Sequence, residues 1–303
     1  MRRLGASLGA RPLPPGPLPP ADHDRRLLLD RLAADAWPAI EVVERRGWRL
    51  RAAEGVTKRA NSALPLTAGV LTGDVLDEQL TAVATFYAER GLPARIQVSD
   101  PLLDAQLAAR GWQVESPTLV LASPVPGARP ASYRAGSPPC GGLLVDTPDV
   151  LTSGSPQGRS SSPPPAATLT PVPDQAWLDC WWSVDGREGP RGLELARRCL
   201  ERIASPTGYA SVRIDGDVVA VARGVVDERW LGLFAMAVLP THRRQGHGRH
   251  LLGALGRWAA THGASAAYLQ LWSGNDPARA LYTAAGFATA YGYHYRNGPA
   301  APG

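Results

Sequence analysis

The sequence lacks the features that mark several specialised classes of protein. No apolar run approaches the ~20 residues that a membrane-spanning helix needs. Its three cysteines, Cys140, Cys180 and Cys199, have neither the spacing of metal ligands nor the density of a disulfide scaffold. We therefore expect a cytoplasmic protein without a membrane partner, and we expect no structural metal.

An excess of charge of either sign is also absent. The chain has 32 Lys and Arg against 27 Asp and Glu, a formal charge of +5. The arginines are scattered and are not interleaved with aromatic residues, so we expect no nucleic-acid partner. A hydrophobic fraction of 44% supports real cores, and 303 residues suffice for two domains of ordinary size.

Two stretches have a composition that disfavours a packed core. Residues 1–21 are rich in proline and glycine, and residues 123–166 are dominated by proline, serine, glycine and alanine. Such segments bury too little apolar surface to offset the entropy lost on ordering. We predict a disordered N-terminal segment (1–21), a first domain (22–122), a flexible linker (123–166) and a second domain (167–303).

Hydrophobic periodicity and turn residues predict helices and strands in both domains. In the first domain a helix starts at Asp22, and the following elements are a hairpin (41–45 and 48–53), a strand (61–66), a helix (76–90), a strand (94–98), a helix (102–110) and a strand (118–121). The second domain has helices at 174–184, 193–204 and 278–285, a helix beginning near Gly248, and strands at 209–214, 218–226, 230–238, 266–271 and 287–295.

The stretch from Val238 to Gly248 joins a predicted strand to a predicted helix. The first turn of a helix presents unpaired N–H groups and a partial positive charge, which suits phosphate. Glycines at 246 and 248 allow a close approach to the backbone, and three arginines, Arg243, Arg244 and Arg249, add charge. The spacing matches neither the Walker loop nor the dinucleotide fingerprint.

This stretch resembles the coenzyme A pyrophosphate loop of the GNAT acyltransferases, whose Arg/Gln-x-x-Gly-x-Gly/Ala pattern is met by Arg243, Gly246 and Gly248. A second motif of that family follows downstream as Asn275-x-x-Ala278-x-x-Leu281-Tyr282-x-x-x-Gly286-Phe287. The order of the predicted elements is also the GNAT order. The resemblance covers about residues 168–296.

The first domain resembles a degenerate copy of the same unit. Residues 108–112 mirror residues 283–287, but Leu107 stands where the second copy has Tyr282, and no Arg-x-x-Gly-x-Gly loop precedes the helix at 76–90. The chain therefore resembles actinobacterial tandem GNAT proteins. This resemblance implies an α/β fold with tandem mixed sheets flanked by helices, and one acetyl-CoA per chain.

The resemblance also implies roles for individual residues in binding acetyl-CoA as co-substrate. The pantetheine arm would lie along Met236, Ala237 and Val238. The backbone N–H of Val238 would contact the thioester oxygen. The pyrophosphate would sit on the loop formed by Arg243, Arg244, Gln245, Gly246, His247, Gly248 and Arg249. Tyr282 would be the general acid, and Asn275 would either bind the coenzyme arm or cap a helix.

The residues that meet the acceptor are less defined. The general base is unknown, and Glu228 is a weak candidate because it falls in a turn. Trp272 stands where many relatives have an acidic residue. Trp181, Asp185, Arg187 and Glu188 are candidates for substrate selection, with core packing as the alternative for the tryptophan. Three histidines, 242, 247 and 250, lie inside the phosphate loop, so we expect no metal site there.

Together these features predict an N-acetyltransferase. We expect direct transfer of the acetyl group of acetyl-CoA to a primary amine of a small molecule, such as an amino acid or a derivative. The alternative is a non-catalytic module that binds acyl-CoA and reports its state to a partner. We expect a monomer or a homodimer.

Overall fold

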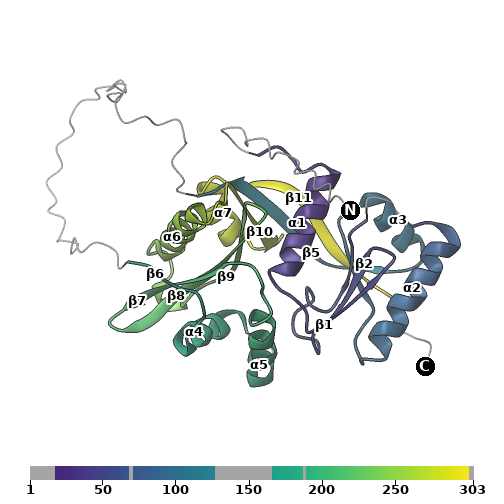
Figure 1. Ribbon diagram of the computed structural model, residues 1–303, viewed down its shortest axis with the longest axis horizontal. Coiled ribbons are helices and arrows are strands. Elements are labelled where there is room, and N and C mark those ends of the chain that lie inside the picture. Colours follow the sequence, from purple (N-terminus) through teal and green to yellow (C-terminus); the bar gives the residue numbers. More distant parts are fainter. Residues whose placement is uncertain (1–17, 68–70, 127–165, 187–188, 300–303) are drawn as a thin grey trace, which may run out of the picture.

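The computed structural model describes residues 18–67, 71–126, 166–186 and 189–299. These residues form an eleven-stranded mixed sheet flanked by seven α-helices, so the predicted α/β class is confirmed (Figure 1). Across the described ranges, none of the helices is long and apolar enough to cross a bilayer.

The order of the elements follows the prediction closely. The first half contains α1 (His23–Asp35), β1 (Glu41–Arg45), β2 (Trp48–Ala52), β3 (Ala63–Pro65), α2 (Gly73–Ala88), β4 (Arg95–Val98), α3 (Pro101–Ala109) and β5 (Gln113–Pro124). The second half contains β6 (Thr168–Thr170), α4 (Gln175–Asp185), α5 (Gly189–Leu200), β7 (Thr207–Ile214), β8 (Asp217–Asp227), β9 (Trp230–Val238), a 3-10 turn (Pro240–His242), α6 (His247–Thr261), β10 (Ala266–Trp272), α7 (Asp276–Ala284) and β11 (Ala288–Asn297).

Local sequence signals account for the element boundaries. Asp174 caps α4 by accepting a hydrogen bond from the Trp177 amide at 2.7 Å, and Asp100 caps α3 in the same way. Asp215 and Gly216 join β7 to β8 with φ angles of 51° and 94°, as the tight turn of a hairpin requires.

The sheet is symmetric about its centre. Its strand order is β1-β2-β3-β4-β11-β5-β10-β9-β8-β7-β6. Apart from the edge strand β6, which has no counterpart, exchanging each strand from β1 to β5 with its counterpart from β7 to β11 reproduces this order in reverse, and the antiparallel and parallel pairings correspond as well. The two halves are therefore copies of one unit, related by an approximate two-fold axis between β5 and β11.

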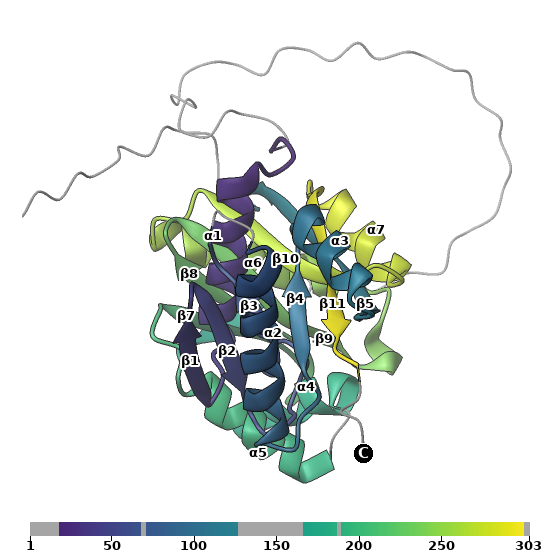
Figure 2. The same cartoon turned by 90° about the vertical axis from the view of Figure 1, so that its right-hand side faces the viewer.

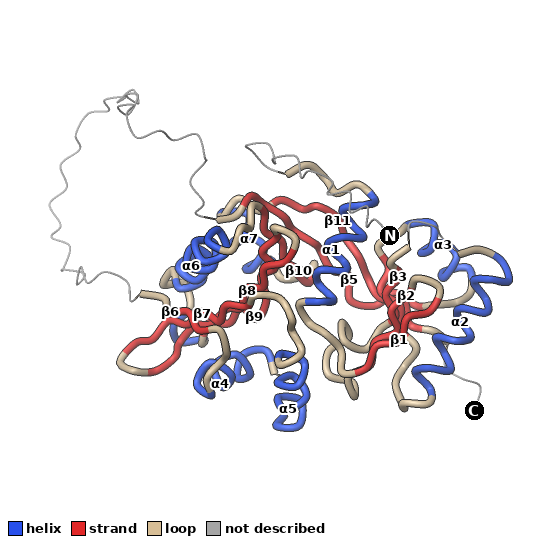
Figure 3. Tube along the Cα trace, viewed as in Figure 1, coloured by secondary structure: helices blue, strands red, loops and turns tan. Residues whose placement is uncertain are grey.

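The two copies exchange their last strands. β5 lies between β10 and β11, and β11 lies between β4 and β5, so each copy completes the sheet of the other (Figure 3). The sequence predicted two domains joined by a linker. The structure instead shows one continuous sheet, because the strand predicted at 118–121 is longer, pairs on both edges and runs into the region assigned to the linker.

The described residues extend into both segments that the sequence predicted to lack a packed core. Leu18 and Ala21 fall in the segment expected to be disordered. Leu18 is nevertheless buried in the core that contains α1, and the amide of Ala21 donates a hydrogen bond to the carbonyl of Ala290 at 3.0 Å. Ser123 and Val125 are also buried. Their apolar contacts and strand pairing outweigh the composition of the sequence around them.

Helices cover both faces of the second half. Residues of α6 and α7 pack on one face of β7 to β10, where Leu251, Leu255 and Tyr282 join the core. Residues of α4 and α5 pack on the other face, together with Trp37 and the loop after β2. Helix α1 lies between the two halves on that second face, against β8 to β11 (Figures 1 and 2). The first half thus covers part of the second.

Candidate active site

The parallel strands β9 and β10 separate part-way along their length. Their pairing runs from Trp230 opposite Ala266 to Leu233 opposite Leu269 and ends there. A bulge follows in β9, where Ala235 has a φ of 52° and the register with β8 shifts. Bulges bend a strand away from its neighbour. Ala237 and Val238, which follow the bulge, are consequently paired with β8 but not with β10.

The amide of Val238 points to this unpaired edge. The amide of Leu239 donates to the Val219 carbonyl at 2.9 Å. In an antiparallel ladder the next opposed pair, Ala220 and Val238, then directs its N–H and C=O groups outward. On that edge the Val238 carbonyl accepts a hydrogen bond from the Nε of Arg243 at 3.2 Å. The amide is left available to a ligand, as an added strand requires.

The loop after β9 ends in a helix N-terminus without a side-chain cap. Gly246 is the N-cap residue of α6 with a φ of 86°, a conformation that favours glycine, and no side chain hydrogen-bonds the first amides of the helix. Arg243, Arg244 and Arg249 are exposed around these amides. Their charges and the helix dipole are of the kind that attracts a polyphosphate.

Gly248 has a different role from Gly246. A Cβ atom on Gly248 would lie 3.0 Å from Cδ2 of Leu281, so its absence lets α7 approach the first turn of α6 closely. Tyr282 follows Leu281 and is 7% exposed in the core shared with α6. Burial raises the pKa of the Tyr282 phenol to about 12. The hydroxyl therefore remains protonated at any physiological pH.

Asn275 caps α7. Its Oδ1 accepts a hydrogen bond from the Ala278 amide at 3.2 Å, while the residue as a whole stays exposed. Of the two roles that the sequence left open for Asn275, the structure shows the cap. Pro277 occupies the first turn, where its missing N–H has no cost.

Comparisons with known proteins agree with this geometry. A family model described as "Probable histone acetyltransferase Rv0428c C-terminal" matches residues 25–296. The chain belongs to this family. Its match spans both copies of the unit, which is consistent with the continuous sheet described above.

Two relatives extend the result. The Probable histone acetyltransferase Rv0428c of Mycobacterium tuberculosis is 28% identical over 256 residues, which cover 80% of this chain but only 65% of that protein. The Uncharacterized N-acetyltransferase YobR of Bacillus subtilis is 26% identical over 272 residues, which cover 88% of this chain and 96% of the relative. Both names refer to acetyltransferases, and acetyl transfer is the general activity that the family relationship supports.

Solved structures confirm the tandem GNAT fold. A GCN5-related N-acetyltransferase from Kribbella flavida aligns with a TM-score of 0.60 and 15% identity, over 92% of this chain and 96% of that chain. A tandem GNAT protein from the clavulanic acid biosynthesis pathway aligns with a TM-score of 0.58 and 11% identity, over 95% and 91% of the two chains. The GNAT resemblance seen in the sequence is therefore confirmed.

In this GNAT fold the residues expected at the acceptor do not all meet. Glu228 lies in the turn before β9, at the opposite end of that strand from Val238, and forms an ion pair with Arg31 of α1. Trp181 is buried against Trp37, with ring centroids 5.9 Å apart. Asp185 is exposed at the end of α4, and Arg187 and Glu188 lie outside the described residues.

The three histidines of the loop do not form a metal centre in the described structure, which contains no cluster of potential ligands of that kind. The rings of His242 and His247 are 6.5 Å apart, and the Nε2 of His250 accepts a hydrogen bond from the Ala167 amide at 3.2 Å. Burial, reinforced by the neighbouring histidines, lowers the pKa of His247. A neutral His247 is thus favoured beside the helix N-terminus.

Sequence reasoning missed a group of polar side chains on the α1 face of the sheet. Among the described residues, buried nitrogen or oxygen atoms without a hydrogen-bond partner occur there in Arg59, Arg223 and Gln270, and also in Trp181, which the sequence had already offered as a candidate. Orphaned buried polar atoms are rare in folded proteins and call for a ligand or water. Arg223 interrupts the apolar strand Val218–Val226, and Gln270 interrupts Ala266–Leu271; a polar residue inside an apolar strand was the available signal.

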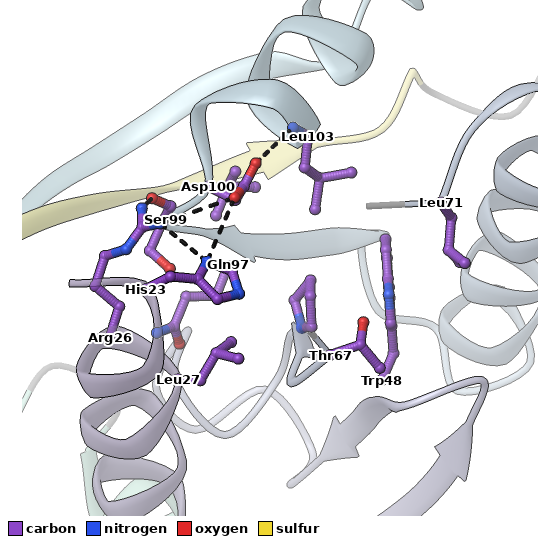
Figure 4. A pocket seen from close by; sticks show the side chains of 12 residues that line it. His23, Arg26, Leu27, Trp48, Thr67, Leu71, Gln97, Ser99, Asp100 and Leu103 are labelled. Carbon is purple, nitrogen blue, oxygen red and sulfur yellow. Dashed lines mark hydrogen bonds and ion pairs between the residues drawn. The ribbon is translucent and has the colours of Figure 1, made fainter. Parts of the chain in front are cut away.

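The first GNAT copy holds only a small cavity at the equivalent position. Strands β3 and β4 also pair briefly, at Ala63 and Ile96, and then diverge. Side chains of α1, including His23 and Arg26, project into the space beyond, and Asp100 and Ser99 hydrogen-bond or ion-pair with α1 there (Figure 4). The remaining volume of about 30 Å³ suits one or two water molecules, not a coenzyme arm.

Proposed function

We propose that the protein transfers the acetyl group of acetyl-CoA to a primary amine of a small molecule, at the divergence of β9 and β10. One observation carries the proposal: the unpaired edge at Val238 leads directly into the uncapped, arginine-rich start of α6. A ligand with an amide-bearing arm followed by phosphates matches both parts. In acetyl-CoA the thioester beyond that arm supplies the acetyl group.

The backbone of β9 and α6 would hold the donor. Met236 to Val238 offer an unpaired strand edge to the arm, and the amides at the start of α6 face the phosphates. The Val238 amide, which points to the same edge, would donate to the thioester carbonyl oxygen. Such a donor aimed at developing negative charge contributes on the order of 3 kcal/mol to the rate.

Tyr282 would supply the proton for the leaving sulfur. The amine nitrogen forms its bond to the acetyl carbon, the carbon–sulfur bond breaks, and the thiolate accepts a hydrogen bond or a proton from the phenol. A buried phenol that stays protonated suits this task. The ammonium proton would leave through water, because the candidate base Glu228 lies at the far end of β9.

A small acceptor fits the surroundings better than a folded protein surface. Phe234, one residue beyond the last β9–β10 pair, is 8% exposed, and Arg223 beside it is 1% exposed. Ion pairs from Glu54 to Arg191 and Arg198 join the first half to α5 across this face. Both halves of the chain therefore contribute residues to the face in front of the divergence, which would restrict the access of a folded protein.

A turnover assay tests the proposal. The protein is incubated with acetyl-CoA and a panel of amino acids, polyamines and lysine peptides, and free thiol and acetylated product are measured together. Replacing Tyr282 with Phe should lower kcat by roughly a hundredfold, the usual range for a general acid, while the Kd for acetyl-CoA measured by calorimetry changes little.

Tyr87→Phe is the matched control, because it removes the hydroxyl of an equally buried tyrosine in the first half, where Tyr87 bonds the backbone of Arg51. It should lower stability without a selective loss of kcat. Full activity of Tyr282→Phe would remove the phenol from the mechanism. Coenzyme binding without turnover on every amine would instead favour the alternative, a non-catalytic acyl-CoA-binding module.

A further inference from the structure

Two arginine side chains approach the ring of Phe234 without an acidic partner. The guanidinium carbons of Arg59 and Arg223 lie 5.7 Å and 4.8 Å from its centroid. Arg59 makes no ion pair or hydrogen bond with the described residues, and its Nε is buried. Arg223 donates one hydrogen bond, from Nη1 to the Ala36 carbonyl at 2.7 Å, and its buried Nε has no acceptor.

Arg51, a buried arginine elsewhere in the chain, makes the hydrogen bonds that Arg59 and Arg223 lack. Arg51 is as buried as Arg223, but it donates to the Ser62 carbonyl, the Ser62 hydroxyl and the Gln97 side chain. Neutral acceptors thus complete its hydrogen bonding. Burying a guanidinium without such partners is costly, since the lost hydration is not replaced. The pair at Phe234 lacks this compensation within the described residues.

Nearby carboxylates are committed to other partners. Asp35 at the end of α1 pairs with Arg31 and Arg49, and Asp227 accepts a hydrogen bond from the Ser205 hydroxyl at 3.2 Å. Burial lowers the pKa of Arg223 to about 10, with the neighbouring Arg59 acting in the same direction. The guanidinium of Arg223 nevertheless stays protonated at neutral pH. The face in front of Phe234 therefore carries this charge beside a second arginine.

The loop that carries Arg59 is held rigidly. The Asn61 side chain, itself buried, bonds four backbone groups of residues 53–57. The indole of Trp37 donates to the Thr57 hydroxyl at 2.9 Å. A loop fixed in this way holds the backbone that carries Arg59, which reduces the entropy lost on binding. The degenerate first copy therefore supplies a cation to the site of the second copy.

The position of the pair fits the acceptor and not the coenzyme. Arg223 is opposite Phe234 in the β8–β9 ladder, just before the bulge that leads to Val238. The face shared by Phe234 and Tyr268 packs against α1, whereas the coenzyme loop begins α6 on the opposite face. Gln270, with its buried amide unpaired, follows Tyr268 by two residues and lies on the same face.

We propose that Arg59 and Arg223 bind an anionic group of the acceptor, so that the preferred acceptors are amines that carry a carboxylate, as amino acids do. This inference rests on the proposed acetyltransferase function and deepens it by naming the substrate class. Two arginines can hold the oxygens of one carboxylate through several charge-assisted hydrogen bonds. The same charges disfavour polyamines and basic peptides.

Matched acceptors test the proposal. Glutamate and other amino acids are compared with their α-carboxamides, with aminoalkylphosphonates, with spermidine and with a lysine peptide, by kcat/KM. The wild type should prefer each acid over its amide. Arg59→Gln should reduce that preference by about tenfold to a hundredfold, chiefly through KM, as loss of a charged hydrogen bond does. Arg59→Lys should restore part of it. A phosphonate preferred over the carboxylates would overturn the assignment to amino acids.

Controls separate this inference from the proposed function. Arg257→Gln removes an exposed arginine on α6 and should leave the acid-to-amide ratio unchanged. The inference would be wrong, although the proposed transferase function would hold, in either of two cases. In the first, kcat/KM is equal for acids and amides; in the second, Arg59→Gln lowers kcat/KM equally for both. If no amine is acetylated, the proposed transferase function is wrong, and the binding of glutamate then tests the inference separately. Glutamate should raise the Tm of the wild type more than that of Arg59→Gln. Equal shifts in Tm would refute the inference.

Discussion

Asp30 of α1 offers a sharp test of the interior between the two copies. Its carboxylate is buried and accepts hydrogen bonds from Tyr291 and Ser99 at 2.8 Å and from Gln97 at 3.2 Å. Burial, opposed by the hydrogen bonds from Tyr291 and Ser99 and by the charges of Arg51 and Arg26, raises the pKa of Asp30 from 3.8 to about 6. Folding therefore favours the protonated form, and ionisation of Asp30 near neutral pH weakens the native state.

The sign and size of the effect follow from linkage. The folded state binds the proton more tightly, so the stabilisation is fully present below pH 3.8 and is lost as the pH rises through about 6. The whole interval corresponds to about 3 kcal/mol, of which roughly half falls between about pH 5 and about pH 8. Asp30→Asn cannot ionise. Its Oδ1 can still accept from Tyr291, and its amide can donate to the Ser99 hydroxyl.

Urea unfolding of both proteins at about pH 5 and about pH 8 measures the difference. Relative to the wild type, Asp30→Asn should gain about 1 to 1.5 kcal/mol between the two conditions. Asp104→Asn is the control without a pH dependence in this window. Although burial opposes it, hydrogen bonds from Arg296 and His294 lower the pKa of Asp104 below 3.8, so its carboxyl is ionised at both pH values and the variant should lose the same stability at each. An Asp30→Asn difference that is independent of pH would refute the reasoning.

Two further predictions concern the coenzyme loop and the exchanged strands. Gly246→Ala should lower the affinity for acetyl-CoA in calorimetry and cost about 1 kcal/mol of stability, because a φ of 86° is strained for alanine. Gly263→Ala is the control: its φ is 83° and its surroundings are equally open, so it should lose about the same stability but retain the affinity. A fragment of residues 167–303 should fail to fold by circular dichroism, because β10 and β11 then lack β5; a folded monomeric fragment would contradict this.

Much of the fold was predictable because its signals are local. Caps such as Asp174, the Asp215–Gly216 turn and the periodicity of the helices depend on residues a few positions apart. The exchange of β5 and β11 was not predictable in this way. Pairing between residues more than 140 positions apart, such as Leu121 and Leu269, leaves no mark on either segment alone.

The candidate site also has a part that local sequence predicts and a part that it does not. The coenzyme loop from Arg243 to Arg249 lies on one continuous segment, and its motif was visible in the sequence. The roles of its parts remain predictions. The acceptor side is assembled from distant segments: Arg59 belongs to one copy and Arg223 to the other, and they meet at Phe234 only through the fold. No spacing rule within either segment indicates that meeting.

The exchanged strands have a consequence for synthesis of the chain. β5 leaves the ribosome well before β10 and β11. Its apolar residues, such as Val120 and Leu121, therefore stay unpaired until these later strands have been synthesised. Both edges of a twelve-residue strand are then unpaired. Assembly of the sheet centre should be a late event that depends on synthesis of β10 and β11. Premature termination would leave an aggregation-prone edge, not a working half-enzyme.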